Sequence, residues 1–180
     1  MQPDYASIVA RRRSLRIDGY MTLADVGFDG DWVTPYQMAS RSMDGPVLVA
    51  QHWLDAQSIE LHRTTLEQLG YLPHIRFNRT LDIALAIAGM ARSSLYMTQA
   101  FQLIPLSSTE RISRRAMDES FDQVTVHELT DRPVIALGAH AVRLCTRHGI
   151  AHVPSPNPSR RGHSNAENAR ELALALAQTA

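Results

Sequence analysis

The chain has 180 residues, of which 44% are hydrophobic and 20% are charged. This balance is typical of one globular domain and excludes an intrinsically disordered chain. The formal net charge is zero, so overall charge gives no sign of a nucleic-acid-binding protein. The sequence has no apolar run of the about 18 residues that a transmembrane helix needs, and no signal-peptide core. We therefore expect no membrane partner.

All 18 basic residues are arginine, and the sequence contains no lysine. A GC-rich coding bias explains this most simply, but it also excludes a Schiff base formed through a lysine side chain. The single cysteine, Cys145, excludes an internal disulfide framework and favours the cytoplasm. Phosphate-loop, dinucleotide-binding and nucleophile-elbow motifs are absent, as is metal-ligand spacing. We expect no cofactor and no metal.

The predicted elements alternate between strands and helices along most of the chain. Residues 1–45 are expected to form a helix followed by an extended lid. Short apolar, β-branched runs then predict four strands, and the segments between them have helical periodicity. The predicted strands span residues 46–50, 95–101, 133–137 and 150–153, and the predicted helices include 57–69, 79–88 and 139–148.

Two helix starts carry the capping-box spacing, in which a serine is followed by glutamate three residues later. Ser107 and Glu110 predict the start of a helix within residues 107–129. Ser164 and Glu167 predict the start of the C-terminal helix. Gly89 predicts the end of the helix over residues 79–88.

Alternating strands and helices predict a single α/β domain over residues 1–180. We expect three αβα layers around a central four-stranded parallel sheet. Ligands of such folds bind outside the carboxyl ends of the strands. The loops of interest are therefore residues 51–55, 99–105, 138–140 and 154–162.

The first of these loops carries polar and aromatic residues directly after a buried strand. Trp53 can stack on a flat ligand, and His52 or Asp55 can act as an acid, a base or an electrostatic partner. The alternative is that Trp53 fills the core and Asp55 caps the next helix. After the second strand, Gln99 can read a base edge through its amide, or it can be a hydrogen-bonded residue of the strand end.

The last loop contains three prolines, at positions 154, 156 and 158, followed by two arginines. Proline fixes φ and removes a backbone donor, so the loop is pre-shaped at low entropic cost. Its side chains can bind phosphate, and a solvated surface loop is the alternative. The candidate DNA-binding residues are Ser155, Asn157, Ser159, Arg160 and Arg161.

Four segments in order resemble the uracil-DNA glycosylase superfamily. VLVAQHWLDA (residues 47–56) stands where that family has its water-activating motif, and Thr98–Gln99 stands at its T-N pair. VIALGAHA (134–141) and VPSPNPSRR (153–161) match its third strand and its H-P-S-P loop. PHIRFNRTL (73–81) resembles the segment that bears the stacking aromatic, which would be Phe77.

The resemblance implies a monofunctional DNA glycosylase that flips a nucleotide and breaks its N-glycosidic bond. It implies that Asp55, His52 and His152 are the catalytic candidates, with Asp44 left open. The implied base-binding residues are Gln51, Trp53, Phe77 and Gln99. DNA is the implied partner, and we expect a monomer.

The sequence departs from the family at three contact positions. His52 replaces the acidic or amide residue of the first motif, Val153 replaces the histidine of the last, and Gln99 is one methylene longer than asparagine. We therefore expect excision of a modified, bulky base rather than plain uracil, as in bacterial defence against phages with modified DNA. The alternatives are a catalytically silent DNA-binding protein and a hydrolase of free nucleosides or nucleotides.

Overall fold

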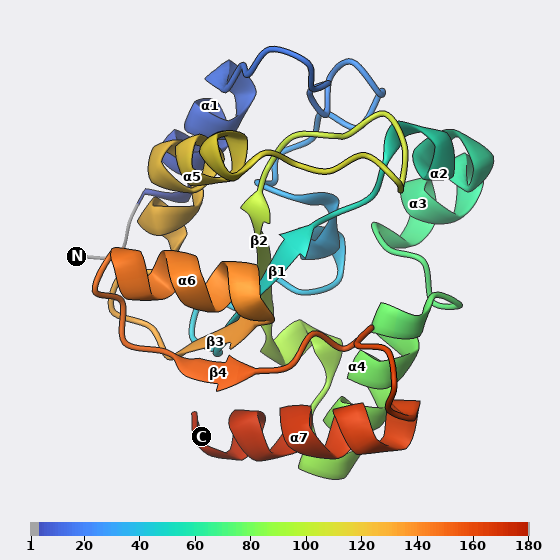
Figure 1. Ribbon diagram of the computed structural model, residues 1–180, viewed down its shortest axis with the longest axis vertical. Helices are drawn as coiled ribbons and strands as arrows, with labels where there is room; N and C mark the ends of the chain where they lie inside the picture. The colour runs from blue at the N-terminus through green and yellow to red at the C-terminus, as the bar shows by residue number, and fades with distance from the viewer. Residues whose placement is uncertain (1–3, 180) are drawn as a thin grey trace.

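A four-stranded parallel sheet lies at the centre of the protein (Figure 1). The computed structural model describes residues 4–179. The strands are β1 (Val47–His52), β2 (Tyr96–Phe101), β3 (Val134–Leu137) and β4 (Val153–Ser155), in the order β2-β1-β3-β4. All three strand pairs are parallel. The predicted α/β fold with a four-stranded parallel sheet is confirmed.

Helices cover both faces of this sheet. On one face, Leu48 and Ala50 of β1 belong to a core with α4 (Arg76–Ala88) and α7 (Asn165–Ala177). On the other face, Val47 and Val49 belong to a core with α1 (Tyr5–Ser14), α5 (Arg114–Gln123) and α6 (Ala139–Arg147). Because side chains alternate across a strand, a strand buried on both faces is apolar throughout. Cys145 is buried on α6.

The predicted helix over residues 57–69 is two helices. They are α2 (Ala56–Leu61) and α3 (Arg63–Leu69), and they meet at His62, whose ψ of 22° departs from helical geometry. Apolar periodicity continues across this break, so the pattern alone does not reveal it.

The fourth strand was predicted three residues too early. Residues 150–152 form a loop, and the ladder with β3 begins at Val153, which pairs with Ile135. Proline is tolerated in this strand because β4 lies at the edge of the sheet. The proline-rich segment therefore begins as a strand and becomes a loop only after Ser155.

One of the two predicted capping boxes is wrong. α5 begins at Arg114, and its cap is Ser113, which accepts from the Ala116 N–H. The Glu110 carboxylate instead accepts from the Leu106 N–H, which closes a turn. The second box is confirmed, because Ser164 and Glu167 each accept from the other's backbone N–H. Gly89 ends α4 in the left-handed conformation, as predicted.

The segment after α1 packs into the fold rather than forming a separate lid. Met21 bridges Ile104 next to the sheet, and Val33 is fully buried. The buried Arg12 guanidinium donates to Asp29 and to the carbonyls of Gly30 and Trp32. A short 3₁₀ helix, η1 (Pro35–Met38), then carries Tyr36 toward the carboxyl end of β1.

A carboxylate lies buried behind the sheet. Glu128, in the 3₁₀ helix η3 (Thr125–Glu128), is 2% exposed. It accepts from the Tyr96 hydroxyl at 2.6 Å, from the Thr98 hydroxyl, and from Gln37 Nε2 at 3.1 Å. Burial raises the pKa of Glu128 to about 7, although these hydrogen bonds act in the opposite direction. Glu128 thereby links β2 with η1.

Candidate functional site

A cavity of about 240 Å³ lies at the carboxyl end of β1, the edge where ligands of this fold class bind. Its walls come from β1, η1, the start of α4 and the loop after β4. The lining residues are Tyr36, Ala50, Gln51, His52, Trp53, Ile75, Phe77, Asn157 and Ser159. Six of these nine residues were predicted from the sequence, so segments far apart in the chain converge as expected.

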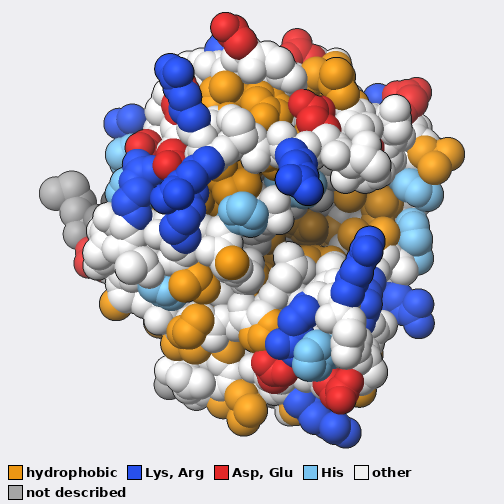
Figure 2. Space-filling view, viewed as in Figure 1, with side chains coloured by type: hydrophobic (Ala, Val, Ile, Leu, Met, Phe, Trp, Pro, Cys, Tyr) orange, Lys and Arg blue, Asp and Glu red, His pale blue; other side chains and the backbone are white. Residues whose placement is uncertain are grey.

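The molecular surface is hollowed on the face seen in Figure 2. Hydrophobic side chains line the depth of the hollow, and basic side chains, all arginine, lie on more than one side of it. The loop from β2 to α5 passes close to α2 in the same view (Figure 1), and the Ala56 N–H donates to the Pro105 carbonyl there.

Trp53 is both a wall of the cavity and a core residue. It is 3% exposed, it meets Phe28 edge to face at 5.3 Å, and its indole N–H donates to the Gly70 carbonyl at 2.9 Å. Gly70 ends α3 at a φ of 75°, and an added Cβ would lie 2.0 Å from the Pro35 carbonyl oxygen. The indole therefore has no free donor and offers the cavity only apolar surface.

His52 lies at the last position of β1. Burial lowers its pKa, and the charge of Asp55 acts against that shift. Because the ordinary pKa of histidine is about 6.5, His52 is neutral at pH 7. Its Nδ1 is buried and has no hydrogen-bond partner among residues 4–179. A neutral imidazole can accept a proton from a bound water through a nitrogen that water reaches.

Asp55 is the N-cap of α2, which is the structural alternative foreseen for it. Its carboxylate accepts from the Ser58 N–H at 3.0 Å and from the Ser58 hydroxyl at 2.6 Å. It is buried and does not line the cavity. Its negative charge nevertheless acts on His52.

Two further aromatic rings add to the apolar part of the wall. Phe77, on the first turn of α4, is the ring predicted to stack on a base. Tyr36 lies with its centroid 6.1 Å from that of Phe77, at an angle of 34°. Burial raises the pKa of Tyr36, so its hydroxyl stays protonated. Sequence analysis missed Tyr36 because no motif marks residues 1–45, and its only signal is an aromatic beside a helix-starting proline.

Gln99 lies beside the cavity rather than in its lining. It pairs in register with Ala50, and alternation along β2 puts it on the same face as Met97, toward α4 and α7. Its Oε1 accepts from the Thr34 hydroxyl at 3.0 Å, and its Nε2 is buried with no partner among the described residues. A buried amide donor without a partner is costly, but Gln99 is fully buried and outside the lining, so a ligand in the cavity does not reach it.

His152 lies at the opposite end of the sheet, contrary to its prediction as a catalytic residue. Val153 and Leu48 both pair with Ile135, so they lie at the same level of the sheet. His152 comes just before Val153 and therefore lies before the first residue pair between β3 and β4. Leu48 and His52 are four positions apart, which corresponds to roughly 13 Å along the strand. Nδ1 of His152 is held by the Ile150 carbonyl at 2.8 Å. His152 therefore lies outside the cavity.

The loop after β4 reaches the cavity through Asn157 and Ser159. Asn157 Oδ1 accepts from the Ser159 N–H at 2.8 Å, which shapes the turn. Gly138, at a φ of 85°, allows Asn157 to approach, since an added Cβ would lie 3.3 Å from the Asn157 Cβ. Ser155 does not fit its predicted contact with DNA phosphate, because its side chain is buried in β4 and its Oγ has no partner among the described residues.

The two arginines of this loop differ in their surroundings. Arg160 donates to Asn168 Oδ1 at 3.1 Å and pairs with Glu171 at 2.7 Å, both on α7. It therefore fastens the loop to α7, and its predicted contact with DNA would have to displace these partners. Arg161 is exposed, and no ion pair joins it to another of the residues 4–179.

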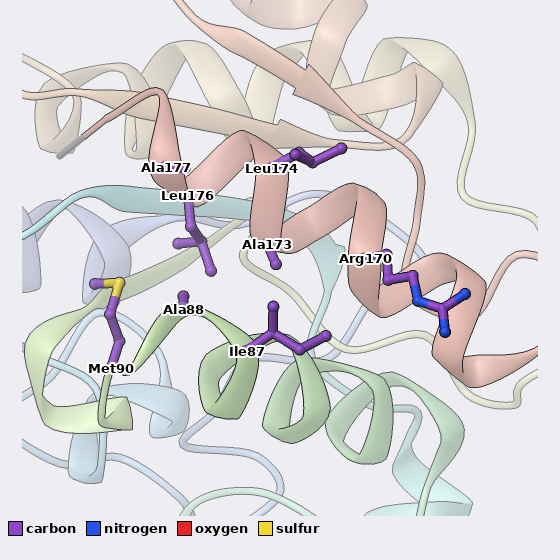
Figure 3. Close-up of a pocket in the computed structure, with 8 residues that line it drawn as sticks. All are labelled: Ile87, Ala88, Met90, Arg170, Ala173, Leu174, Leu176 and Ala177. Atoms are coloured by element: carbon purple, nitrogen blue, oxygen red, sulfur yellow. The ribbon is translucent and has the colours of Figure 1, made fainter.

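A larger groove lies elsewhere, between α4 and α7 (Figure 3). It measures about 830 Å³, and apart from Arg170 its lining is apolar: Ile87, Ala88, Met90, Ala173, Leu174, Leu176 and Ala177. It offers no acid, base or nucleophile. The smaller cavity at the sheet edge therefore carries the candidate chemistry, although the groove is larger.

Compared with protein-family models and with curated proteins, the chain matches none. Within residues 4–179, no three His, Cys, Asp or Glu side chains are grouped so that they could hold a metal ion. No helix in that range has the length and apolar character needed to cross a bilayer. The function must therefore be argued from the cavity itself.

Proposed function

We propose that this protein is a monofunctional DNA glycosylase that removes a modified base and leaves an abasic site. One observation carries the proposal: a ring-sized cavity at the carboxyl edge of a parallel sheet combines Phe77, a neutral His52 and the Asn157 loop. Aromatic rings hold a flipped base by stacking, and polar groups read its edge. The motif order along the sequence supports the same reading.

The cavity volume favours a base with one ring. Sites for drug-sized ligands measure about 300–1,000 Å³, and this cavity is smaller. A compact substituent on a pyrimidine fits this space better than the bulky modification expected from the sequence. A sugar attached to the base would have to extend out of the cavity.

The proposed reaction is hydrolysis of the bond between C1′ of the deoxyribose and a nitrogen of the base. The bond breaks with its electron pair on the base, and the sugar becomes cationic, as in glycoside hydrolysis. Water then bonds to C1′ and gives a proton to the neutral imidazole of His52, while the departed base takes a proton from solvent. The buried charge of Asp55 favours the cationic sugar and the protonated imidazole.

The function is tested by incubating the protein with duplexes that contain uracil, 5-hydroxymethylated or glucosylated pyrimidines, and by counting abasic sites. We expect abasic sites with at least one modified pyrimidine and no strand cleavage, because the chain has no lysine for a lyase step. Tight DNA binding without abasic sites would instead support a silent binder. Activity only on free nucleosides would support the small-molecule hydrolase.

Replacing Arg161 with alanine should weaken DNA binding and reduce its salt dependence. One lost phosphate contact lowers the slope of log K against log salt by about 0.9. Arg160→Ala serves as the comparison, since that side chain bonds to α7 and its loss should lower the melting temperature. Binding titrations at several salt concentrations measure the slope, and an unchanged slope for Arg161→Ala would contradict the contact.

A further inference from the structure

The groove between α4 and α7 is an exposed apolar surface that the chemistry of the cavity does not use. Three of the seven large apolar side chains that are exposed among residues 4–179 lie on these two helices: Ile83, Ile87 and Leu174. Ile87 is 55% exposed and Leu174 is 66% exposed, and both line the groove. Single exposed apolar residues are ordinary, whereas a contiguous patch of them marks an interaction surface.

The two helices run side by side in the same direction. At their first residues, Arg76 Nε of α4 donates to Asn165 Oδ1 of α7 at 3.0 Å. At their last residues, Ala88 of α4 and Ala177 of α7 line the same groove (Figure 3). Both carboxyl ends therefore lie together at one end of the groove.

The two ends of the groove differ in charge. Arg170 lies at one end, and Met90 and Ala177 lie at the other (Figure 3). The Arg170 guanidinium forms no hydrogen bond or ion pair with another of the residues 4–179. Neither α4 nor α7 has a basic residue in its last turn. Because the carbonyls at the carboxyl end of a helix carry partial negative charge, two such ends side by side make the other end of the groove negative.

This polarity makes the groove complementary to itself. A helix rises about 1.5 Å per residue, so Leu174 lies about 6 Å along α7 from both Arg170 and Gln178, the residue that follows the helix. A two-fold axis near Leu174 sets α7 of one copy antiparallel to α7 of a second copy. Each Arg170 then lies beside the negative end of the other groove, and the two Leu174 side chains pack between the copies. A two-fold interface uses the same patch on both copies, as this patch allows.

We propose that the protein forms a homodimer through this groove, with the two α7 helices antiparallel and each Arg170 at the helix carboxyl ends of the other copy. The inference does not rest on the proposed function. Phe77, which lines the cavity, lies ten positions before Ile87 on α4, roughly 15 Å away along the helix. The dimer therefore leaves both cavities open. The monomer expected from the sequence is the alternative outcome of the test.

Sedimentation equilibrium of the 180-residue chain, from low micromolar to a few hundred micromolar, measures the state of assembly. We expect a reversible equilibrium that reaches twice the mass of one chain. Leu174→Glu places two like charges near the axis and should raise the dimer dissociation constant about tenfold or more. The matched control is Leu61→Glu on α2, a similarly exposed leucine outside the groove. It should leave the constant within about twofold of the wild-type value.

Arg170→Glu examines the charge complementarity separately. It sets an acid beside the negative helix ends, and because the contact occurs twice, the dissociation constant should rise about fivefold or more. Arg115→Glu, at an exposed arginine on α5, changes the net charge equally and is the control. All four substituted side chains are exposed, so the circular dichroism spectrum should stay that of the wild type.

Three results would overturn the proposal. The first is the mass of a single chain at every concentration. The second is a dimer that neither groove variant weakens, because its interface then lies elsewhere. The third is a dimer that Leu174→Glu weakens and Arg170→Glu leaves unchanged, because the antiparallel arrangement requires the Arg170 contact.

Discussion

Replacing His52 with glutamine should lower the rate of base excision by about 10²–10⁴-fold, the usual contribution of a general base. Glutamine retains hydrogen-bonding capacity but cannot take up a proton at neutral pH. The loss should appear in kcat, and affinity for an uncleavable 2′-fluoro duplex should change little. Single-turnover rates with an active substrate measure the effect.

His152→Gln is the matched control, because that histidine lies at the far end of the sheet and bonds to the Ile150 carbonyl. It should excise at the wild-type rate.

The pH dependence of the excision rate gives a second test of the role of His52. Burial lowers the pKa of His52, so the base form persists to below about pH 6.5, and the rate should fall only on further acidification. Equal losses for both variants would contradict the role given to His52.

The Glu128→Gln variant should remove a large pH dependence of stability. The folded pKa of Glu128 is raised to about 7 from an ordinary 4.5, so the folded state favours the protonated form. Its contribution is therefore complete below about pH 4.5 and is lost as pH rises through 7. A difference of about 2.5 units corresponds to about 3 kcal/mol, as an order of magnitude. Glutamine imitates the protonated acid and does not titrate.

Denaturant unfolding between pH 5 and pH 8 measures this effect. The wild-type free energy of unfolding should fall across the range, and that of Glu128→Gln should be flatter. Tyr96, Tyr5 and Arg132 interact with Glu128; the tyrosines titrate far above this range, and arginine stays charged. His127, the neighbour of Glu128 in η3, is present in both proteins, so its titration does not distinguish them. The exposed Glu67→Gln on α3 is the control and should retain the wild-type slope. Parallel slopes for Glu128→Gln and wild type would refute the assignment.

Glu128 also connects stability with the site. It binds Gln37, the neighbour of the cavity residue Tyr36, and Thr98, the neighbour of Gln99. Gln99 is held further by the Gln102 and Thr125 side chains, which donate to its carbonyl. The residues around the cavity are therefore supported from behind the sheet by one buried polar network, in which Gln99 Nε2 and Gln102 Oε1 have no partner among the described residues.

The pattern of apolar residues along the sequence determined the sheet by itself, because strands buried on both faces must be apolar and the helices between them must have an apolar stripe. It also placed Gln51, His52, Trp53, Asn157 and Ser159 in one region, since parallel strands end at one edge, whereas Phe77 was expected there only from the family resemblance. Only the tertiary structure decided what each side chain does there. Asp55 and Arg160 are bound to local partners, and His152 is at the far end of the sheet. Tyr36 and Thr34 approach from a segment without a motif. Periodicity reports which face a residue takes, whereas hydrogen-bond partners depend on contacts between distant segments that no local pattern contains.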